Sequence, residues 1–486
     1  MFGNLFRRNL LNCFGTNTRK GDDQKMLLPK LTVLGQTTKT LGDWKGLNCR
    51  AAIAEEELAD CANISTEELP ALTVCNPWTL YRSSGQTTGT ADIIGLDNSL
   101  LEVLPESPCR IIRHHWTDAL TEQISEIQLN TGDLFLYAAE FQGGLVLMVK
   151  NGTSTRLVYY KQDGTVQTSD ITELLSGLSG EPQGLYANSR RLFILQNDYI
   201  HISYDREIEN WQVYLINNSV APVCAQLMDM NVGGRFTAGV DYKSNMLMFK
   251  RGVMYGIFNK SAPFYIAKIA DVGCINPRSI AICRGTLYFL SQEGIMAYTG
   301  GLPQLVSGNC PDLADKLSDS TACSDGRYYY IGNYVYDTEN QQWSKIRAEQ
   351  SGVALSSKGC FNGKVYYLKK AGGAYETYIY QPNQFDSTST PTEWFFKTKL
   401  FLADSQKKKL FTRLVLRVEP MQSTSLTVFV SADGGAFSSV YTGTVTQAKA
   451  VEIPLRIPPC ESLQVKVSGV GKTAVTYLKY SYRVLS

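Results

Sequence analysis

Short runs of apolar and aromatic residues, separated by glycine and polar residues, dominate the middle of the chain. Runs of this kind, bounded by turn residues, are typical of buried β-strands. The runs begin at Leu134, Leu192, Met246, Leu287, Tyr328 and Val365. From Met246 onward they recur after 41, 41 and 37 residues. Because one four-stranded propeller blade takes roughly 40–50 residues, this spacing predicts a β-propeller.

A second repeat has a similar period. Tyr204-Asp205 is followed by Trp211, and Tyr336-Asp337 by Trp343, both in the pattern Y-D-x5-W. The separation of the two copies is close to three times the spacing of the apolar runs. We expect the aspartate to form a hairpin turn and the tryptophan to pack between blades. The visible units predict five to seven blades.

After Glu393 the pattern changes to alternating apolar and polar positions, which favours a separate antiparallel β-sandwich. The predicted fold class is therefore all-β, a β-propeller with an N-terminal extended arm and a C-terminal antiparallel β-sandwich. The predicted divisions are an arm over residues 1–42, a segment leading into the propeller over 43–130, the propeller over 131–393 and the sandwich over 394–486. Helical periodicity is rare, and its best candidates are Arg50–Leu58, Asp118–Ile127 and Asp312–Leu317.

Composition narrows the class of protein. The chain has 486 residues, enough for two or three domains, and is 44% hydrophobic and 19% charged. A formal charge of only +2 argues that any contact with nucleic acid is local or non-specific. No apolar run is long enough for a transmembrane helix, so we expect no membrane contact. The 12 cysteines include no Cys-x-x-Cys pair, which fits thiols that act as small buried hydrophobes in a reducing compartment.

The segment from Met1 to Lys20 carries basic but no acidic side chains and lacks the apolar core of a secretory signal. We interpret it as a flexible arm that orders against a partner, with a transit-like amphipathic segment as the alternative.

Candidate chemistry is sparse. Gly469-Val470-Gly471-Lys472-Thr473 ends like a phosphate-binding loop, but Lys466 stands where the first glycine belongs and a strand pattern follows. Adjacent His114 and His115 would point to opposite faces of a strand and would not easily share a metal ion. We therefore expect no catalytic residues, no cofactor and no metal, and a protein that is not an enzyme.

One charge run carries a sharper alternative. Lys407-Lys408-Lys409 is either a solvated surface or a contact with packaged DNA or an acidic neighbour.

Residues 273–301, GCINPRSIAICRGTLYFLSQEGIMAYTGG, form the densest pattern in the chain. Cys274, Arg278 and Cys283 invite a catalytic interpretation, but the regular steps on either side make this stretch one blade. In that interpretation Pro277 and Arg278 form the corner before the blade, and Gly294 forms a hairpin turn.

Three stretches resemble a known family. The first match is to the opening of tail-associated proteins of bacteriophages infecting Gram-positive bacteria, often labelled DNA-stabilisation proteins. This chain resembles that opening at Trp44-Lys45-Gly46-Leu47-Asn48, then at Ala59 to Ser65 and then at Glu68 to Leu72. Gly273 to Ser279 with Leu287 to Leu290 is similar to a block in phage tail hub and nozzle proteins, and the C-terminal module with Ser431 to Gly435 is the third match. Thr73-Val74-Cys75 departs from the family's Ser-x-Arg ending.

The resemblance implies a virion structural protein with a propeller, located in the tail or neck and assembled in the bacterial host cytoplasm. It implies a homo-oligomeric ring, a hexamer, that contacts the portal, the adaptor and other tail proteins, retains packaged DNA by non-specific contact and forms part of the DNA exit channel. The alternative is a receptor-binding or carbohydrate-active propeller at the tail tip. Tyrosines clustered in strands favour packing, whereas tyrosines on loops between blades would favour that alternative.

Overall fold

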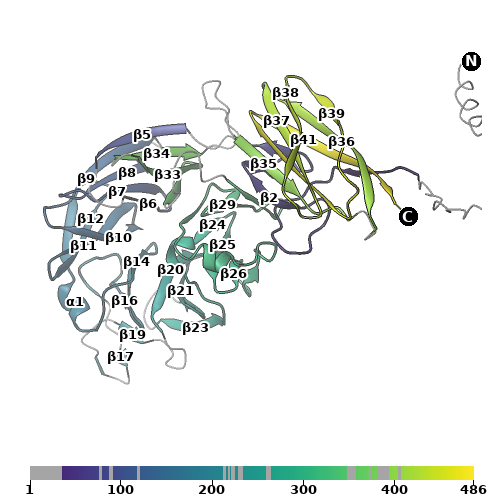
Figure 1. Ribbon diagram of the computed structural model, residues 1–486. Coiled ribbons are helices and arrows are strands. Elements are labelled where there is room, and N and C mark those ends of the chain that lie inside the picture. Colours follow the sequence, from purple (N-terminus) through teal and green to yellow (C-terminus); the bar gives the residue numbers. More distant parts are fainter. Residues whose placement is uncertain are drawn as a thin grey trace, which may run out of the picture.

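The computed structural model describes residues 35–485 with short gaps, and almost all of their regular structure is β (Figure 1). The residues outside the description are 1–34, 76–78, 87–90, 118–120, 212–214, 217–218, 221–224, 228–233, 259–263, 347–356, 372–373, 381–392, 403–406 and 486. The predicted all-β class is confirmed.

Seven four-stranded antiparallel sheets in the described part of the chain are arranged around a common centre as the blades of a propeller (Figure 1). Blade 1 is β6 (Asp92–Gly95), β7 (Ser99–Leu104), β8 (Arg110–Trp116) and β9 (Glu122–Gln128), and blade 2 is β10 (Leu134–Phe141), β11 (Gly144–Asn151), β12 (Ser154–Tyr160) and β13 (Val166–Asp170). Blade 3 is β14 (Gly184–Ala187), β15 (Leu192–Gln196), β16 (Tyr199–Ile202) and β19 (Ala225–Leu227), and blade 4 is β20 (Phe236–Tyr242), β21 (Asn245–Lys250), β22 (Met254–Phe258) and β23 (Tyr265–Ala270). Blade 5 is β24 (Ala281–Cys283), β25 (Thr286–Ser291), β26 (Gly294–Tyr298) and β27 (Gln304–Leu305), and blade 6 is β28 (Ala322–Ser324), β29 (Tyr328–Ile331), β30 (Tyr334–Asp337) and β31 (Gln342–Lys345). Blade 7 is β32 (Lys358–Phe361), β33 (Lys364–Ala371), β34 (Ala374–Tyr380) and β5 (Thr79–Gln86).

Five of the six apolar runs in the sequence form the second strand of their blade. That strand lies inside the sheet with a neighbouring blade on each face, so its apolar side chains are buried, as in β15 and β29. The run at Leu134 is the exception, because it begins the first strand of blade 2. The hairpin of β17 (Leu215–Ile216) and β18 (Ser219–Val220) is inserted in blade 3 and lengthens the step before Met246. Separate apolar clusters fill the successive interfaces between blades.

Blade 7 is completed from the other end of the propeller sequence. Strand β5 pairs with β34, so a segment that precedes blade 1 supplies the outer strand of the last blade. Arg82 of β5 donates a hydrogen bond to the fully buried Glu102 of blade 1. Glu102 also contacts His114 Nε2 at 2.7 Å and accepts a hydrogen bond from Thr377 of β34 at 2.7 Å. This polar network joins the first and last blades at the seam.

Two further sheets lie beside the propeller (Figure 1). One contains β1 (Thr37–Leu41), β3 (Ile64–Ser65), β4 (Leu72–Val74), β41 (Thr473–Val484), β36 (Lys409–Pro420) and β39 (Lys449–Pro454). The other contains β2 (Leu58–Ala62), β35 (Glu393–Thr398), β40 (Leu463–Val470), β37 (Thr424–Ala432) and β38 (Ser438–Val445). Their inner faces share one buried cluster, in which the rings of Phe401 and Tyr480 stack 4.4 Å apart.

The boundaries differ from those expected. Residues 37–74 supply four strands to the two sheets beside the propeller, and residues 92–128 already form blade 1, whereas the sequence suggested an arm to 42 and a leading segment to 130. Strands β1, β2 and β4 pair with β35 and β41 from the far end of the chain, so no local pattern reveals the pairing. The buried cluster between the two sheets continues into blades 5 and 6, which joins sandwich and propeller through one core.

Helices are few among the described residues. They are α1 (Thr172–Ser176), α2 (Leu313–Lys316) and the single 3-10 turn η1 (Pro277–Ser279). The expected helix at Asp312–Leu317 is confirmed by α2, whereas Arg50–Leu58 forms turns before β2 and the described part of Asp118–Ile127 lies largely in β9. No helix in the described ranges is long and apolar enough to span a bilayer.

Candidate functional site

The two Y-D-x5-W copies place their aspartates in equivalent turns. Asp205 accepts two hydrogen bonds from Arg190, to Oδ1 at 2.7 Å and to Oδ2 at 2.6 Å. Asp337 accepts from Arg327 at 3.2 Å and from the backbone amide of Glu339 at 3.0 Å. In both blades the arginine comes from the turn between the first and second strands. The aspartate therefore fixes two neighbouring turns, which is a structural role.

The aromatic residues of the repeat differ in burial. Trp343 is 1% exposed, and its ring packs at a tilt against that of Tyr336, with the ring centres 4.8 Å apart. Its Nε1 donates to the carbonyl of Val306 in the connection after blade 5 at 2.9 Å. Trp211 is only half-buried and Tyr204 is 52% exposed. Trp343 is therefore packed between its own strand pair and the end of blade 5, whereas Tyr204 and Trp211 of the earlier copy are less buried.

The corner at residues 276–278 reaches across the ring of blades. Asn276 accepts a hydrogen bond from the Arg278 amide at 2.9 Å, which starts η1 at Pro277. The Arg278 side chain forms an ion pair with Asp92 of blade 1. Gly294 has a φ of +130° in the β25–β26 hairpin, where an added Cβ would lie 2.4 Å from Ser307 Oγ. Cys274 and Cys283 are buried, so neither thiol is accessible from solvent.

The lysine run divides into two kinds of residue. Lys407 and Lys408 are exposed, but Lys409 is fully buried at the start of β36. Its Nζ donates to the backbone carbonyls of Lys407 at 2.9 Å and Glu461 at 2.8 Å. The expectation of a DNA or partner contact is therefore corrected for Lys409, because the two carbonyls hold its ammonium group in the protein interior.

Two other candidates are explained by the strands around them. Gly471, with a φ of +110°, makes the hairpin between β40 and β41, so the residues that end like a phosphate-binding loop form a turn. His114 is part of the seam network. Among the described residues, no three histidine, cysteine or acidic side chains gather in a way that would hold a metal ion.

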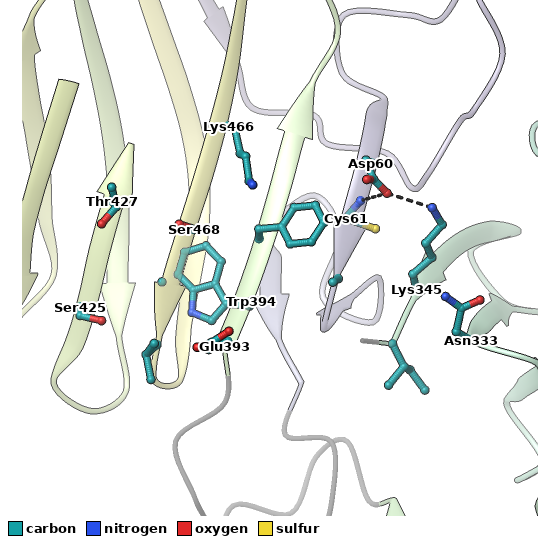
Figure 2. Close-up of a pocket in the computed structure, with 15 residues that line it drawn as sticks. Asp60, Cys61, Asn333, Lys345, Glu393, Trp394, Ser425, Thr427, Lys466 and Ser468 are labelled. Carbon is teal, nitrogen blue, oxygen red and sulfur yellow. Dashed lines mark hydrogen bonds and ion pairs between the residues drawn. The ribbon is translucent and has the colours of Figure 1, made fainter. Parts of the chain in front are cut away.

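A hollow lies where the sandwich meets blade 6 (Figure 2). It is a cleft of about 630 Å³, lined by strands β2, β35, β37 and β40 on one side and by the end of blade 6 on the other. Most of its side chains are polar, namely Asp60, Asn333, Lys345, Glu393, Ser425, Thr427, Lys466 and Ser468. We call it the junction cleft.

An ion pair spans the junction cleft from one module to the other. Lys345 Nζ of blade 6 lies 2.9 Å from Asp60 Oδ1 of β2 and 5.3 Å from the ring centre of Tyr334 (Figure 2). Burial alone would lower the pKa of Lys345, but the hydrogen bond and charge of Asp60 outweigh it and raise that pKa. Lys345 therefore stays protonated and fastens the sandwich to the propeller.

The sandwich wall of the cleft carries a second ammonium group. Lys466 Nζ lies 5.0 Å from the ring centre of Phe395 and 5.8 Å from that of Phe429. It forms no ion pair with any residue in the described ranges. The hydroxyls of Thr427 and Ser468 lie on the same wall (Figure 2). This surface can accept carboxylate or other anionic and polar groups of a partner.

The junction cleft could not be seen in the sequence. Asp60, Lys345 and Lys466 come from three distant segments, and each looks like an ordinary surface residue in its own surroundings. Of these three residues only Lys466 is distinctive in the sequence, because it occupies the position of the first glycine in a phosphate-binding loop.

Comparison with known proteins yields likeness of fold only. No protein-family model and no curated protein matches the chain. The β-propeller domain of the Trilobed protease from Pyrococcus furiosus covers 65% of this chain and 98% of its own, with 12% identity and a TM-score of 0.37. Hsv2p from Kluyveromyces lactis covers 68% and 94%, with 10% identity and a TM-score of 0.34. An exo-β-1,3-galactanase from Phanerochaete chrysosporium covers 83% and 100%, with 10% identity and a TM-score of 0.28.

One expectation is corrected by these comparisons. An enzyme was not expected because catalytic motifs are missing, yet a galactanase is among the structures similar to this chain. A lack of motifs therefore does not exclude catalysis. At such identities and TM-scores the likeness assigns no activity to this chain either.

Proposed function

We propose that this chain is a bacteriophage virion protein that forms a homo-oligomeric ring close to the portal, in the neck, hub or nozzle of the tail. The ring retains packaged DNA and forms part of its exit channel. The proposal rests on the positions, in the structure, of the residues that resemble phage tail proteins. They occupy the positions that join the sandwich to the propeller and fix the corner before blade 5.

The first of these stretches is the link between the modules. Leu47 donates its amide to the carbonyl of Trp343 in blade 6 at 2.6 Å, and Asn63 donates its amide to the carbonyl of Lys345 at 2.8 Å. Asn63 Nδ2 also donates to the carbonyl of Glu393 at 2.7 Å, where sandwich strand β35 begins. Since Trp44 and Leu47 are buried as well, these motif residues hold two modules as one body.

The second stretch fixes the corner before blade 5. An added Cβ on Gly273 would lie 1.9 Å from the backbone carbonyl oxygen of Lys250, so only glycine fits there. Asn276 Nδ2 donates to the carbonyls of Leu317 at 3.2 Å and Ser320 at 2.7 Å, which ties blade 5 to the start of blade 6. Motif residues with such roles specify a rigid body, which suits a subunit that must hold its shape under DNA pressure.

The junction cleft is the surface at which we propose that a neighbouring copy binds. It lies between the two modules, and Lys466 offers a positive charge without an acidic partner in the described ranges. An acidic side chain of the next subunit would pair with it.

The placement of tyrosines weighs against the receptor-binding alternative. Tyrosines of blades 6 and 7 pack inside and between sheets, among them Tyr329, Tyr330, Tyr366 and Tyr367, each no more than 1% exposed. Sugar-binding sites need exposed aromatic faces, and Tyr204 is the one tyrosine above half exposure among the described residues.

The test is the assembly state of the purified protein, measured by mass photometry and electron microscopy. A closed ring of uniform copy number is the expected result. Lys466→Glu should open the ring or prevent it from forming, and Lys449→Glu, at an exposed lysine of β39 in the other sheet, should leave it intact. A monomer at every concentration overturns the ring, and a monomer or trimer that binds or cleaves polysaccharide supports the alternative instead.

A further inference from the structure

Two cysteines meet where the link between the modules crosses the connection from blade 5 to blade 6. The Cys49 amide donates to the carbonyl of Asn309 at 2.8 Å, so Cys49 lies beside the residue that precedes Cys310. In the other direction, Cys310 Sγ lies 4.0 Å from the carbonyl oxygen of Leu47. These reciprocal contacts bring the two residues to adjacent positions on neighbouring segments, and the two thiols interact directly. A disulfide needs this proximity.

The pair is asymmetric in a way that favours oxidation. Cys49 is exposed, whereas Cys310 is 1% exposed. The thiol of Cys310, and then the charges of Lys345 and Lys316, lower the pKa of Cys49 to about 7 against the effect of its partial burial. The pKa of Cys310 is raised by the same neighbour and by burial. Cys49 is thus the thiolate that reacts first, and Cys310 is the neighbouring thiol that resolves the oxidised Cys49.

We propose that Cys49 and Cys310 form an intramolecular disulfide when the protein meets a peroxide. The Cys49 thiolate attacks one oxygen of hydrogen peroxide, the O–O bond breaks and the departing hydroxide takes up a proton to form water. This leaves a sulfenic acid on Cys49. The sulfur of Cys310 then attacks that of Cys49, the S–O bond breaks, and the hydroxide leaves as water with the Cys310 proton. Two thiols and one peroxide give one disulfide and two waters.

The bond would fasten the module link to the propeller covalently. The link already contacts blade 6 through Leu47 and Asn63, and Cys310 lies between β27 and α2 on the propeller side. Cross-linking residues so far apart in sequence restricts the unfolded chain strongly. Oxidation should therefore raise the unfolding temperature of the full-length protein without changing its fold.

Trypsin provides a direct measurement. Cleavage after Lys45, Arg50, Arg284 and Lys316 releases residues 46–50 with Cys49 as their single cysteine and residues 285–316 with Cys310 as theirs. The protein is treated with hydrogen peroxide, blocked with N-ethylmaleimide and digested without reductant. The expected product in mass spectrometry is these two peptides joined with the loss of two hydrogens. Its rate of formation at low peroxide should fall roughly tenfold from pH 8 to pH 6, as the thiolate is protonated.

Single substitutions distinguish the Cys49–Cys310 disulfide from other oxidation products. Cys49→Ser and Cys310→Ala should both abolish the linked peptide and the rise in unfolding temperature. Cys61→Ala, at a buried cysteine of β2 that lies nearby, should keep both. If Cys310→Ala fails to fold, the exposed Cys49→Ser variant still decides. Recovery of Cys49 as free thiol, as sulfinic acid or linked to any other cysteine overturns the proposal.

Discussion

The ion pair between Arg82 and Glu102 joins the outer strand of the last blade to the second strand of the first. The Glu102 carboxylate is buried, while the Arg82 side chain is 27% exposed. A buried carboxylate with three partners is costly to disturb, because loss of its charge weakens the contacts with Arg82, His114 and Thr377.

Glu102→Gln should therefore loosen the seam. We expect a loss of about 2 kcal/mol in the free energy of unfolding, measured by urea denaturation. Glu452→Gln is the matched control, because Glu452 pairs with Arg413 on the surface at 3.4 Å, and it should change stability by less than about 0.5 kcal/mol. Equal effects of the two variants would contradict this role of the seam.

Acid should weaken the same seam. Burial raises the pKa of Glu102, but His114, Arg82 and Thr377 outweigh it, so the pKa lies below its ordinary value. The carboxylate therefore contributes stability above the unfolded pKa near 4.3, and this is lost as pH falls through the lower folded value. The difference in unfolding temperature between the natural protein and Glu102→Gln should shrink from pH 6 to pH 3. A constant difference would show that ionisation of Glu102 does not matter. Glu122, 4.0 Å from His114 Nδ1, is the other acidic group of this network.

Lys358 is a buried charge whose removal should stabilise the propeller. It is 1% exposed, donates to the carbonyl of Gly332 and lies 5.3 Å from the Tyr367 ring centre. Burial lowers its pKa to about 8, with Cys323 opposing slightly. Between about pH 8 and 10.5 the unfolded state binds more protons, so stability should rise with pH there.

Lys358→Met should remove that rise and, at pH 7, stabilise the protein by about 1–3 kcal/mol. Differential scanning calorimetry at pH 7 and 10 measures both effects. A variant less stable than the natural protein at pH 7 would show that the hydrogen bond to Gly332 outweighs the cost of burying the ammonium group.

Gly273→Ala tests the corner before blade 5. Its Cβ would lie 1.9 Å from a backbone oxygen, so the chain must shift, and we expect a loss of about 3 kcal/mol. Gly301→Ala is the control, because nothing lies within 4 Å of the added Cβ. Thermal unfolding of the two variants should differ clearly, and similar unfolding temperatures would contradict the close approach.

The exposed lysines just before β36, Lys407 and Lys408, give a test of DNA contact. Lys407→Ala with Lys408→Ala should weaken non-specific binding of duplex DNA and lower the slope of log affinity against log salt by about 2. Fluorescence anisotropy at several salt concentrations measures the slope. Lys449→Ala should leave the slope unchanged. An unchanged slope in the double variant would show that Lys407 and Lys408 do not contact DNA.

The repeating part of the fold could be read from the sequence because its signal is local. A run such as Leu287–Leu290 is entirely apolar since neighbouring blades cover both faces of its sheet, and that pattern needs no knowledge of the rest of the chain. Strand β5 lacks such a signal. Its sequence, TLYRSSGQ, is mostly polar, and its partner β34 lies beyond all six of the other blades in sequence. The closing strand and the early sandwich strands were therefore missed.

The same distinction separates the candidate sites. Asp205 and Asp337 could be found because a turn repeats its own sequence pattern, although their arginine partners could not. For Lys409 the prediction of a surface or DNA-contacting side chain was wrong. Its ammonium group is buried because the carbonyls of Lys407 and Glu461 accept its hydrogen bonds, and the sequence of the lysine run does not reveal these contacts. The junction cleft was not visible because long-range pairing alone brings Asp60 to Lys345.

The strands at residues 37–74 also have a consequence for synthesis on the ribosome. They emerge early, but β1 and β4 pair with β41, and β2 pairs with β35, which emerge late. Strand β5 must likewise wait for β34. Blades 1 to 6 can form during translation, while β1, β2 and β4 remain without these partners until β35 and β41 have emerged. A nascent chain halted before residue 393 would therefore lack β35 and β41, and β1, β2 and β4 would be left without the strands they pair with in the native fold.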